Sequence, residues 1–354
     1  MQEQPLHTGT NYLQGMMMKK IGFYLTLGLL SAASFSNFAQ SDTEMAALKD
    51  LLDHRKYRVL SAQIEQIPNH QQQPELALLK AKAMYLLKDT EALDTWMEPL
   101  LKDNPTHAQL HYIAALNKFN LAQEASIFSA AGHAKDGLAL IKQAVALDPA
   151  DLEIQHALIG FYSGAPSIAG GDEKEAQRLA DAMFAKDPVQ GTVAKATLLL
   201  KDDDNVDSAK AMIEQQLAAA PQNVDLLELK AAILASQDQD KMAFELYQQA
   251  ATLAEKPNDR YASLYQIGRL AAAKQQDANK GIEALEQYIS FYQDSDDRQL
   301  HWAKLRLAQI HFARKDFDKA NALVQQLRAE KNEQEKFVDE LKAFEKQLKK
   351  VKTS

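Results

Sequence analysis

Apolar residues recur at spacings of three and four along almost the whole chain from residue 43 onward, which is the period of an α-helix. Leu76, Leu79 and Ala83 show this spacing, and Leu227, Ala231 and Leu234 repeat it further along. Polar segments separate these apolar stretches and group them in twos. The pattern therefore predicts a succession of helix pairs.

Proline marks the ends of several pairs, because it stops a helix or begins the next one. These prolines are Pro105, Pro149, Pro188, Pro221 and Pro257, at intervals of 44, 39, 33 and 36 residues. A period in the thirties with two helices per unit is typical of a helical solenoid.

One position in the second helix of each unit holds a small residue: Ala92, Gly137, Ala176, Ala209, Ala243, Gly281 and Ala320. The residue four positions later is bulky in six of these seven units. Two helices approach closely only where a small side chain lies at their crossing. This pattern resembles the tetratricopeptide repeat (TPR) family. The alternative is an irregular all-helical domain.

The resemblance implies an all-α fold, a right-handed superhelical α-solenoid of about seven to eight TPR-like helix pairs. We expect the repeat array to cover residues 43–328 and a C-terminal capping helix and tail to cover 329–354. In the tail, Phe337, Leu341, Phe344 and Leu348 are spaced by four, three and four residues. This amphipathic stripe favours a cap over the last repeat. The alternative is a partner-binding or coiled-coil helix.

Two units carry insertions, Ala125–Gly132 and the loop at 163–171. Their sequences, A-S-I-F-S and A-P-S-I-A-G-G-D, resemble segments found in a subgroup of secreted bacterial TPR proteins of unsettled function.

The N-terminus, residues 1–39, predicts an extension followed by a cleavable signal peptide. Lys19 and Lys20 precede an apolar run from Ile21 to Ala33, and Ala39 is the expected residue before the cut. A basic start, a short apolar run and a small residue are typical of export. Residues 16–39 would form the signal peptide, and the mature chain would be periplasmic or secreted. An uncleaved membrane anchor is the alternative.

Composition narrows the possible functions. Only 13 glycines and 10 prolines in 354 residues argue against a hairpin-rich β fold. The net charge of −8 argues against a nucleic-acid partner and against adhesion to anionic membranes. No cysteine is present, so disulfides and thiolate chemistry are excluded.

Three motifs suggest chemistry but are better explained as structure. The run Gly170-Gly171-Asp172-Glu173 reads as a turn with Asp172 near a helix N-cap. His107 and His111 have metal-ligand spacing but no third ligand at a matching offset, and we expect two surface or groove histidines. The acidic run 202–205 lacks the glycine turn and distal glutamate of a calcium loop. We therefore predict no enzyme activity, no metal site and no cofactor.

The expected binding surface is the concave groove lined by the first helix of each unit. Equivalent offsets from Lys230, Ile267 and Leu307 select eight residues: Asp225, Glu228, Tyr265, Arg269, Trp302, Leu305, Gln309 and Phe312. Trp, Tyr and Arg are enriched at binding hot spots. Ordinary packing between repeats is the alternative explanation for Tyr265 and Trp302.

The sequence thus favours an exported scaffold or adaptor that binds a protein or peptide partner in its groove, without catalysis and without stable membrane insertion after signal cleavage. The alternatives are a small-molecule capture subunit for a transporter and an envelope-assembly factor.

Overall fold

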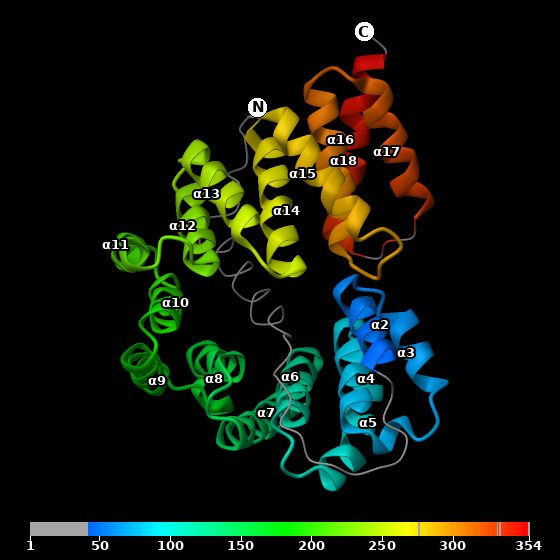
Figure 1. The fold of residues 1–354 in the computed structure, drawn as a ribbon. Coiled ribbons are helices and arrows are strands. Elements are labelled where there is room, and N and C mark those ends of the chain that lie inside the picture. Colours follow the sequence, from blue (N-terminus) through cyan, green and yellow to red (C-terminus); the bar gives the residue numbers. More distant parts are fainter. Residues whose placement is uncertain (1–41, 275–276, 331, 333, 353–354) are drawn as a thin grey trace. The chain divides into compact units, whose positions relative to one another are not determined.

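The computed structural model describes residues 42–274, 277–330, 332 and 334–352, and the predicted signal peptide lies outside them. The described residues form α-helices joined by short turns and three 3-10 helices, with no β-strand among them (Figure 1). The chain divides into two compact units, Met1–Met212 and Ile213–Ser354.

The first unit holds the following helices: α2 (Asp42–Asp53), α3 (Tyr57–Glu65), α4 (Pro74–Leu87), α5 (Thr90–Asp103), α6 (Ala108–Glu124), α7 (Ile127–Leu147), α8 (Leu152–Gly164), α9 (Glu173–Lys186) and α10 (Pro188–Leu199). Helix α11 (Val206–Ala219) contains the boundary. The second unit continues with α12 (Val224–Ser236), α13 (Asp240–Leu253), α14 (Pro257–Lys274), α15 (Ala278–Phe291), α16 (Gln299–Ala313), α17 (Phe317–Ala329) and α18 (Glu335–Lys352).

Even-numbered helices from α2 to α16 are the first members of their pairs, and we call them A helices; their odd-numbered partners are B helices. Most A helices pack on their own B helices, as α6 on α7 and α12 on α13, and several successive A helices also contact one another, as α4 with α6 and α14 with α16. Helix α10 is the exception, because it packs on the preceding α9 rather than on α11. This arrangement confirms the prediction of an all-α solenoid of TPR-like helix pairs. The first pair of the array, α2/α3, precedes the seven units whose small positions the sequence shows.

The small positions of the B helices explain the close packing within pairs. Ala176, Ala209, Ala243 and Ala320 are fully buried, and the two glycines leave no room for a side chain. A Cβ atom on Gly281 would overlap the Cβ of Ala271, and one on Gly137 would overlap the Phe119 ring. Small residues are therefore required at these crossings.

The helix pair α4/α5 departs from this pattern. Ala92 is exposed, and the inward stripe of α5 is instead Leu93, Met97 and Leu100. Trp96 is half-buried; its ring stacks on His70 with centroids 5.7 Å apart, and the Lys80 ammonium lies 4.1 Å from the ring centroid. The helix rotates to bury its three larger apolar residues, because these contribute more apolar area than one alanine.

Two predicted turns have the expected local structure. The side chain of Asp172 caps α9 by accepting hydrogen bonds from the backbone N–H groups of Lys174 and Glu175, at 3.0 and 3.1 Å. Asp202 accepts from the backbone N–H of Asp204 at 3.1 Å. Both acidic motifs therefore act as caps.

The two histidines on α6 have different environments. His107 is the N-cap residue of the helix, and its ring accepts from the Leu110 N–H. His111 is buried, with 3% of its surface exposed, and its Nδ1 lies 3.1 Å from the His107 carbonyl oxygen. The prediction that both are surface or groove residues is wrong for His111.

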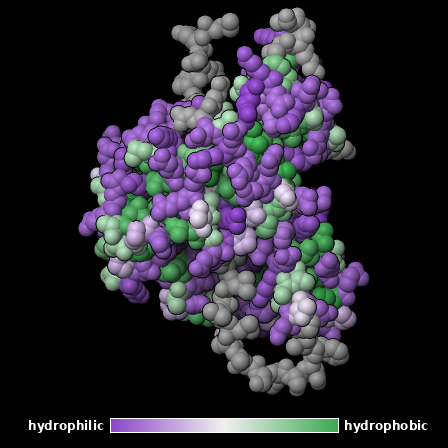
Figure 2. All heavy atoms as spheres, turned by 45° about the horizontal axis from the view of Figure 1, so that its top comes forward, coloured by the Kyte–Doolittle hydropathy of each residue, from purple (hydrophilic) through white to green (hydrophobic). Residues whose placement is uncertain are grey.

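The helices bury their apolar stripes efficiently. The face seen in Figure 2 is mostly hydrophilic, with hydrophobic residues in separate patches among the polar ones. Within the described part of the chain, no helix is long and apolar enough to cross a membrane.

Candidate functional site

The predicted partner-binding residues of the second unit lie on α12, α14 and α16, but the structure divides them into two groups. Asp225, Arg269, Trp302, Gln309 and Phe312 are partly exposed. Glu228, Tyr265 and Leu305 are buried, with 5%, 7% and 0% of their surface exposed.

The three buried residues have structural partners. The Glu228 carboxylate accepts a hydrogen bond from the Ser263 hydroxyl at 2.6 Å, which links α12 to α14. The ring of Tyr265 packs on Tyr288, with centroids 5.5 Å apart. Leu305 belongs to the apolar core that α16 shares with α17 and α18. Because these side chains face inward, the prediction that they line an open groove is wrong.

The error lies in one offset: the positions two residues before Lys230, Ile267 and Leu307 are buried, whereas the positions two residues after Ile267 and Leu307 are partly exposed. On α14 the partly exposed stripe passes through Gln266 and Arg269, and on α16 it passes through Trp302, Arg306 and Gln309. A shift of one residue turns a side chain by about 100° around an α-helix. The predicted offsets therefore selected Tyr265 and Leu305 where the neighbouring Gln266 and Arg306 face outward.

Gln266, Arg269, Trp302, Arg306 and Gln309 form what we call the Gln–Arg stripe. Equivalent positions on α14 and α16 hold one glutamine and one arginine each, in opposite order. Arg269 Nε donates to Gln266 Oε1 at 2.9 Å, and an Arg306 guanidinium N–H donates to Gln309 Oε1 at 2.8 Å. The pairing holds both arginines along their helices.

Arg306 is the functional candidate that sequence reasoning missed. Its guanidinium lies 5.1 Å from the centroid of the Trp302 ring, which is within cation–π range. It also pairs with the carboxylate of Glu340 on α18, and Gln309 Nε2 donates to the same carboxylate at 3.1 Å. The available signal was the spacing of four between Trp302 and Arg306, which places both on one helix face.

Helix α18 lies directly against this part of α16. Phe337 packs edge-on against Trp302, with ring centroids 5.2 Å apart, and Phe344 packs edge-on against Phe312 at 5.5 Å. The Trp302 indole N–H donates to Gln334 Oε1 at 3.3 Å. The predicted cap is confirmed, and it covers part of the predicted partner surface.

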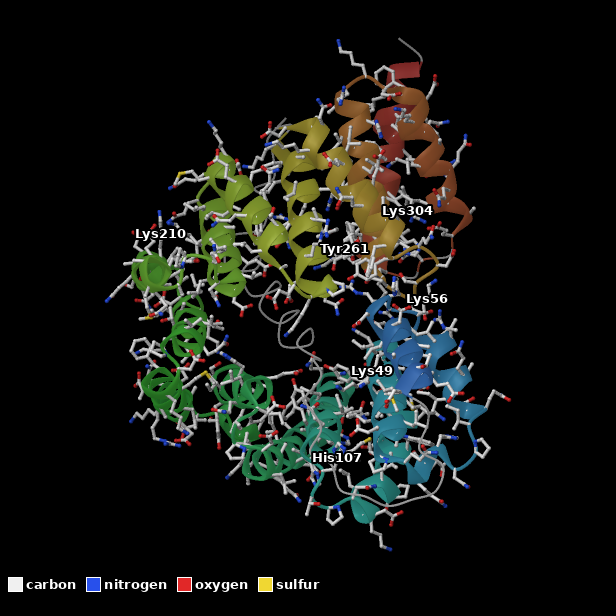
Figure 3. The ribbon with its side chains drawn as sticks, viewed as in Figure 1. Lys49, Lys56, His107, Lys210, Tyr261 and Lys304 are labelled. Carbon is white, nitrogen blue, oxygen red and sulfur yellow. The ribbon has the colours of Figure 1, made fainter. Side chains whose placement is uncertain are left out.

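The environment of α16 also affects two histidines. Burial lowers the pKa of His301, against the opposing effect of the Glu330 carboxylate 3.3 Å away. Burial likewise lowers the pKa of His311, which lies 3.5 Å from Asp316. Lys304, labelled in Figure 3, donates to Glu330 at 2.6 Å and so joins the same group of charges.

The A helices of the first unit carry a different polar cluster. Lys82 on α4 and Tyr112 on α6 are buried, and burial lowers the pKa of Lys82 and raises that of Tyr112. The carboxylates of Glu153, Glu75 and Asp151 partly offset the first shift. Glu75 is also approached by His107, labelled in Figure 3, which lowers the pKa of the carboxyl group.

No set of three or more His, Asp or Glu residues in the described ranges has the geometry to hold a metal ion.

Comparison with known proteins gives only a likeness of fold. No family model matches the sequence, and no curated protein matches it. Among solved structures, the human IFIT1 dimer with PPP-AAAA aligns at 15% identity and a TM-score of 0.47, over 79% of this chain and 65% of that one. A monomeric IFIT1 mutant with m7Gppp-AAAA aligns at 15% identity and a TM-score of 0.48, over 79% of this chain and 64% of that one. The chain thus spans less than two thirds of the length of IFIT1.

Proposed function

We propose that this protein is an exported helical-repeat scaffold that binds a protein or peptide partner through the A helices of its second unit and performs no catalysis. The observation that carries the proposal is the Gln–Arg stripe. Two consecutive A helices hold a tryptophan, two arginines and two glutamines at partly exposed positions, where α18 already contacts Trp302, Arg306 and Gln309. Arginine and tryptophan are the residue types most enriched at binding hot spots.

The stripe suits a polypeptide partner. Arginine offers several N–H donors in a fixed plane and glutamine offers both a donor and an acceptor, which together match backbone carbonyls, backbone amides and carboxylates. The Trp302 ring, beside Arg306, adds an apolar anchor with a polar edge.

Export is the second part of the proposal. It is supported by the basic start and apolar run of residues 19–33 and by Ala39 before a polar chain. The two insertions support membership of the secreted bacterial TPR subgroup. With the signal cleaved, the mature chain would be periplasmic or secreted.

An affinity capture tests the proposal. The bait is the chain from Gln40, presented to an envelope extract, and the test variant is Arg269→Ala with Trp302→Ala. Tyr265 is unsuitable for substitution because it is a core residue. We expect a protein that is retained by the unmodified chain and lost with the variant.

The matched control is Lys241→Ala with Glu245→Ala, two exposed substitutions on α13 that should leave capture unchanged. Equal recovery by the unmodified chain and the Arg269/Trp302 variant, both folded by circular dichroism, would contradict the assignment of the stripe.

The second candidate function is capture of a small polar molecule, and the buried cluster of the first unit favours it. Lys82 and Tyr112 are buried side chains, and Gln109 Oε1 is a buried acceptor without a hydrogen-bond partner in the described structure. Buried polar groups normally have partners. Native mass spectrometry of the purified chain would show a retained small molecule if this function holds, and the unliganded mass if it does not.

A further inference from the structure

Helix α18 buries one face only. Its buried side chains are Phe337, Leu341, Phe344 and Leu348, which contact the core formed by Leu305, Ala308, Val324 and Leu327 on α16 and α17. Val338, Glu340 and Glu345 are partly buried at the edges of this face, and most of the other described side chains of the helix are charged and exposed. Within the described residues α18 makes its main helix contacts with α16 and α17 alone.

Two ion pairs fix the position of α18 on this face. Glu340 pairs with Arg306 of α16, and Glu345 pairs with Arg328 of α17. The face under α18 is therefore apolar in its centre and basic at two points of its rim, and α18 supplies carboxylates at the matching points. Complementarity of this kind sets the register and direction of a bound helix.

The same face contains half of the residues that sequence analysis assigned to the partner. Trp302 contacts Phe337, Gln309 contacts Glu340, and Phe312 contacts Phe344. Leu305 is buried in the same core. Leu305 is fully buried, and a partner can contact the full faces of Trp302, Gln309 and Phe312 only if α18 leaves them.

We propose that the face of α16 and α17 under α18 is a binding surface for an acidic amphipathic helix of a partner protein, and that α18 is its competitor within the chain. This inference rests on the proposed function and names the class of its partner. The fitting helix has aromatic or aliphatic residues at i, i+4, i+7 and i+11 and acidic residues at i+3 and i+8, as α18 has from Phe337 onward. Helix-in-groove binding uses this spacing of anchors.

Release of α18 without a replacement would leave a contiguous apolar face exposed to water, which favours aggregation. The covered state is therefore the resting state, and a partner helix exchanges for α18. Binding strength then depends on how firmly α18 is docked, because a binding-competent state that is rarely populated lowers apparent affinity in proportion.

A charge-reversal experiment on the full chain tests this exchange. The probe is a fluorescently labelled peptide with the sequence of residues 334–352, and binding is followed by anisotropy. The test variant is Glu340→Arg with Glu345→Arg, which weakens docking of α18 but leaves the surface on α16 and α17 intact. We expect the peptide to bind this variant at least tenfold more tightly than it binds the unmodified chain.

Two controls make the result specific. A peptide that carries the same two reversals should not bind this variant, because arginine would meet Arg306 and Arg328. The chain with Arg306→Glu and Arg328→Glu should prefer the reversed peptide. Equal affinity of the original peptide for the unmodified and Glu340/Glu345 chains, with both folded by circular dichroism, would overturn the inference.

The peptide-binding experiment and the envelope capture can fail independently, so the role of α18 and the proposed function are tested separately. If the envelope capture retains a partner equally with the unmodified and Glu340/Glu345 chains, the scaffold function stands and the competitor role of α18 is wrong. If the peptide binds as expected but neither chain retains an envelope protein, the surface binds helices and the exported-adaptor function is wrong.

Discussion

Helices α17 and α18 both pack on α16, but they do so by different means. The turn between α16 and α17 is short, with Lys315 at a φ of 65°, and α17 places the fully buried Ala320 against its partner. Helix α18 follows after residues 330–334 and packs through large side chains, Phe337 and Phe344 among them. Ion pairs at its rim complete the contact.

The difference separates an integral contact from a removable one. A small residue at a helix crossing lets the two backbones approach closely. Large apolar anchors with charges at the rim are instead the usual composition of an interface between separate molecules. On our proposal, the last pair of the solenoid is integral to the fold, whereas α18 is removable.

Phe344→Ala should destabilise the packing of α18 more than any other substitution considered, because it removes the aromatic contact with Phe312. Truncation of a buried Phe costs about 3–5 kcal/mol. Here the loss is limited by the docking energy of α18, so we expect α18 to undock while α16 and α17 remain folded. Urea unfolding followed by circular dichroism would show an early transition of small amplitude. The exposed substitution Lys346→Gln, between residues of similar helix propensity, is the control and should leave the unfolding curve unchanged. A single cooperative transition shifted as a whole would contradict the separation of α18.

Ala320→Leu should lower the free energy of unfolding by less than Phe344→Ala, but it should destabilise a larger part of the second unit. The added atoms cannot be accommodated at a fully buried crossing, and overpacking of this kind costs about 1–3 kcal/mol. Because α17 is integral, we expect the main transition of the second unit to shift to lower urea and α18 to be lost with it. An unchanged main transition would show that α17 is also removable.

Acidification should weaken the packing of α17 and of α18 on α16, because two histidines of α16 lie at these contacts. Burial depresses the pKa of His301 and His311 below the ordinary value of 6.5, so the unfolded chain takes up protons first as the pH falls. Stability is highest above about pH 6.5 and decreases as the pH falls below that value, until the folded pKa values are reached. The measurement is the melting temperature between about pH 7.5 and 5.5.

Single substitutions show whether the pH dependence of the melting temperature arises at the contact of α16 with α18 or at its contact with α17. His301 lies against Phe337 of α18, with ring centroids 5.7 Å apart, whereas His311 lies beside Asp316 at the start of α17. His301→Gln should remove the pH dependence of α18 docking, and His311→Gln that of the main transition. A pH dependence that survives both substitutions would assign it to other groups.

Arg328→Ala should have the smallest effect on the docking of α18. Arg328 pairs with Glu345, but its side chain is 51% exposed, and exposed ion pairs contribute less than about 1 kcal/mol. We expect α18 to remain docked, with a slightly earlier first transition in urea. Complete undocking would mean that charge, rather than apolar contact, holds the helix.

The sequence predicted the helix pairs well because their signal is periodic and local. The buried positions of Ala176, Ala243 and Ala320 and the apolar stripe of α18 all follow from residue spacing. Ala92 is the exception, because three larger residues on α5 compete for the same core.

The outward-facing residues of α12, α14 and α16 were predicted less well because they depend on helix rotation. Tyr265 and Gln266 are neighbours in sequence but lie about 100° apart around α14, and only tertiary packing decides which of them faces outward. That α18 covers Trp302 and Phe312 is likewise a long-range contact, which no spacing along the chain encodes.

Hydrogen exchange on the full chain, read by mass spectrometry, tests the central claim that α18 is a separable cover of the partner surface. The account predicts that backbone amides of α18 exchange at a lower opening free energy than those of α16 and α17, while the rest of the second unit stays protected. Amides of α17 and α18 that exchange together, in one cooperative opening with α16, would contradict it.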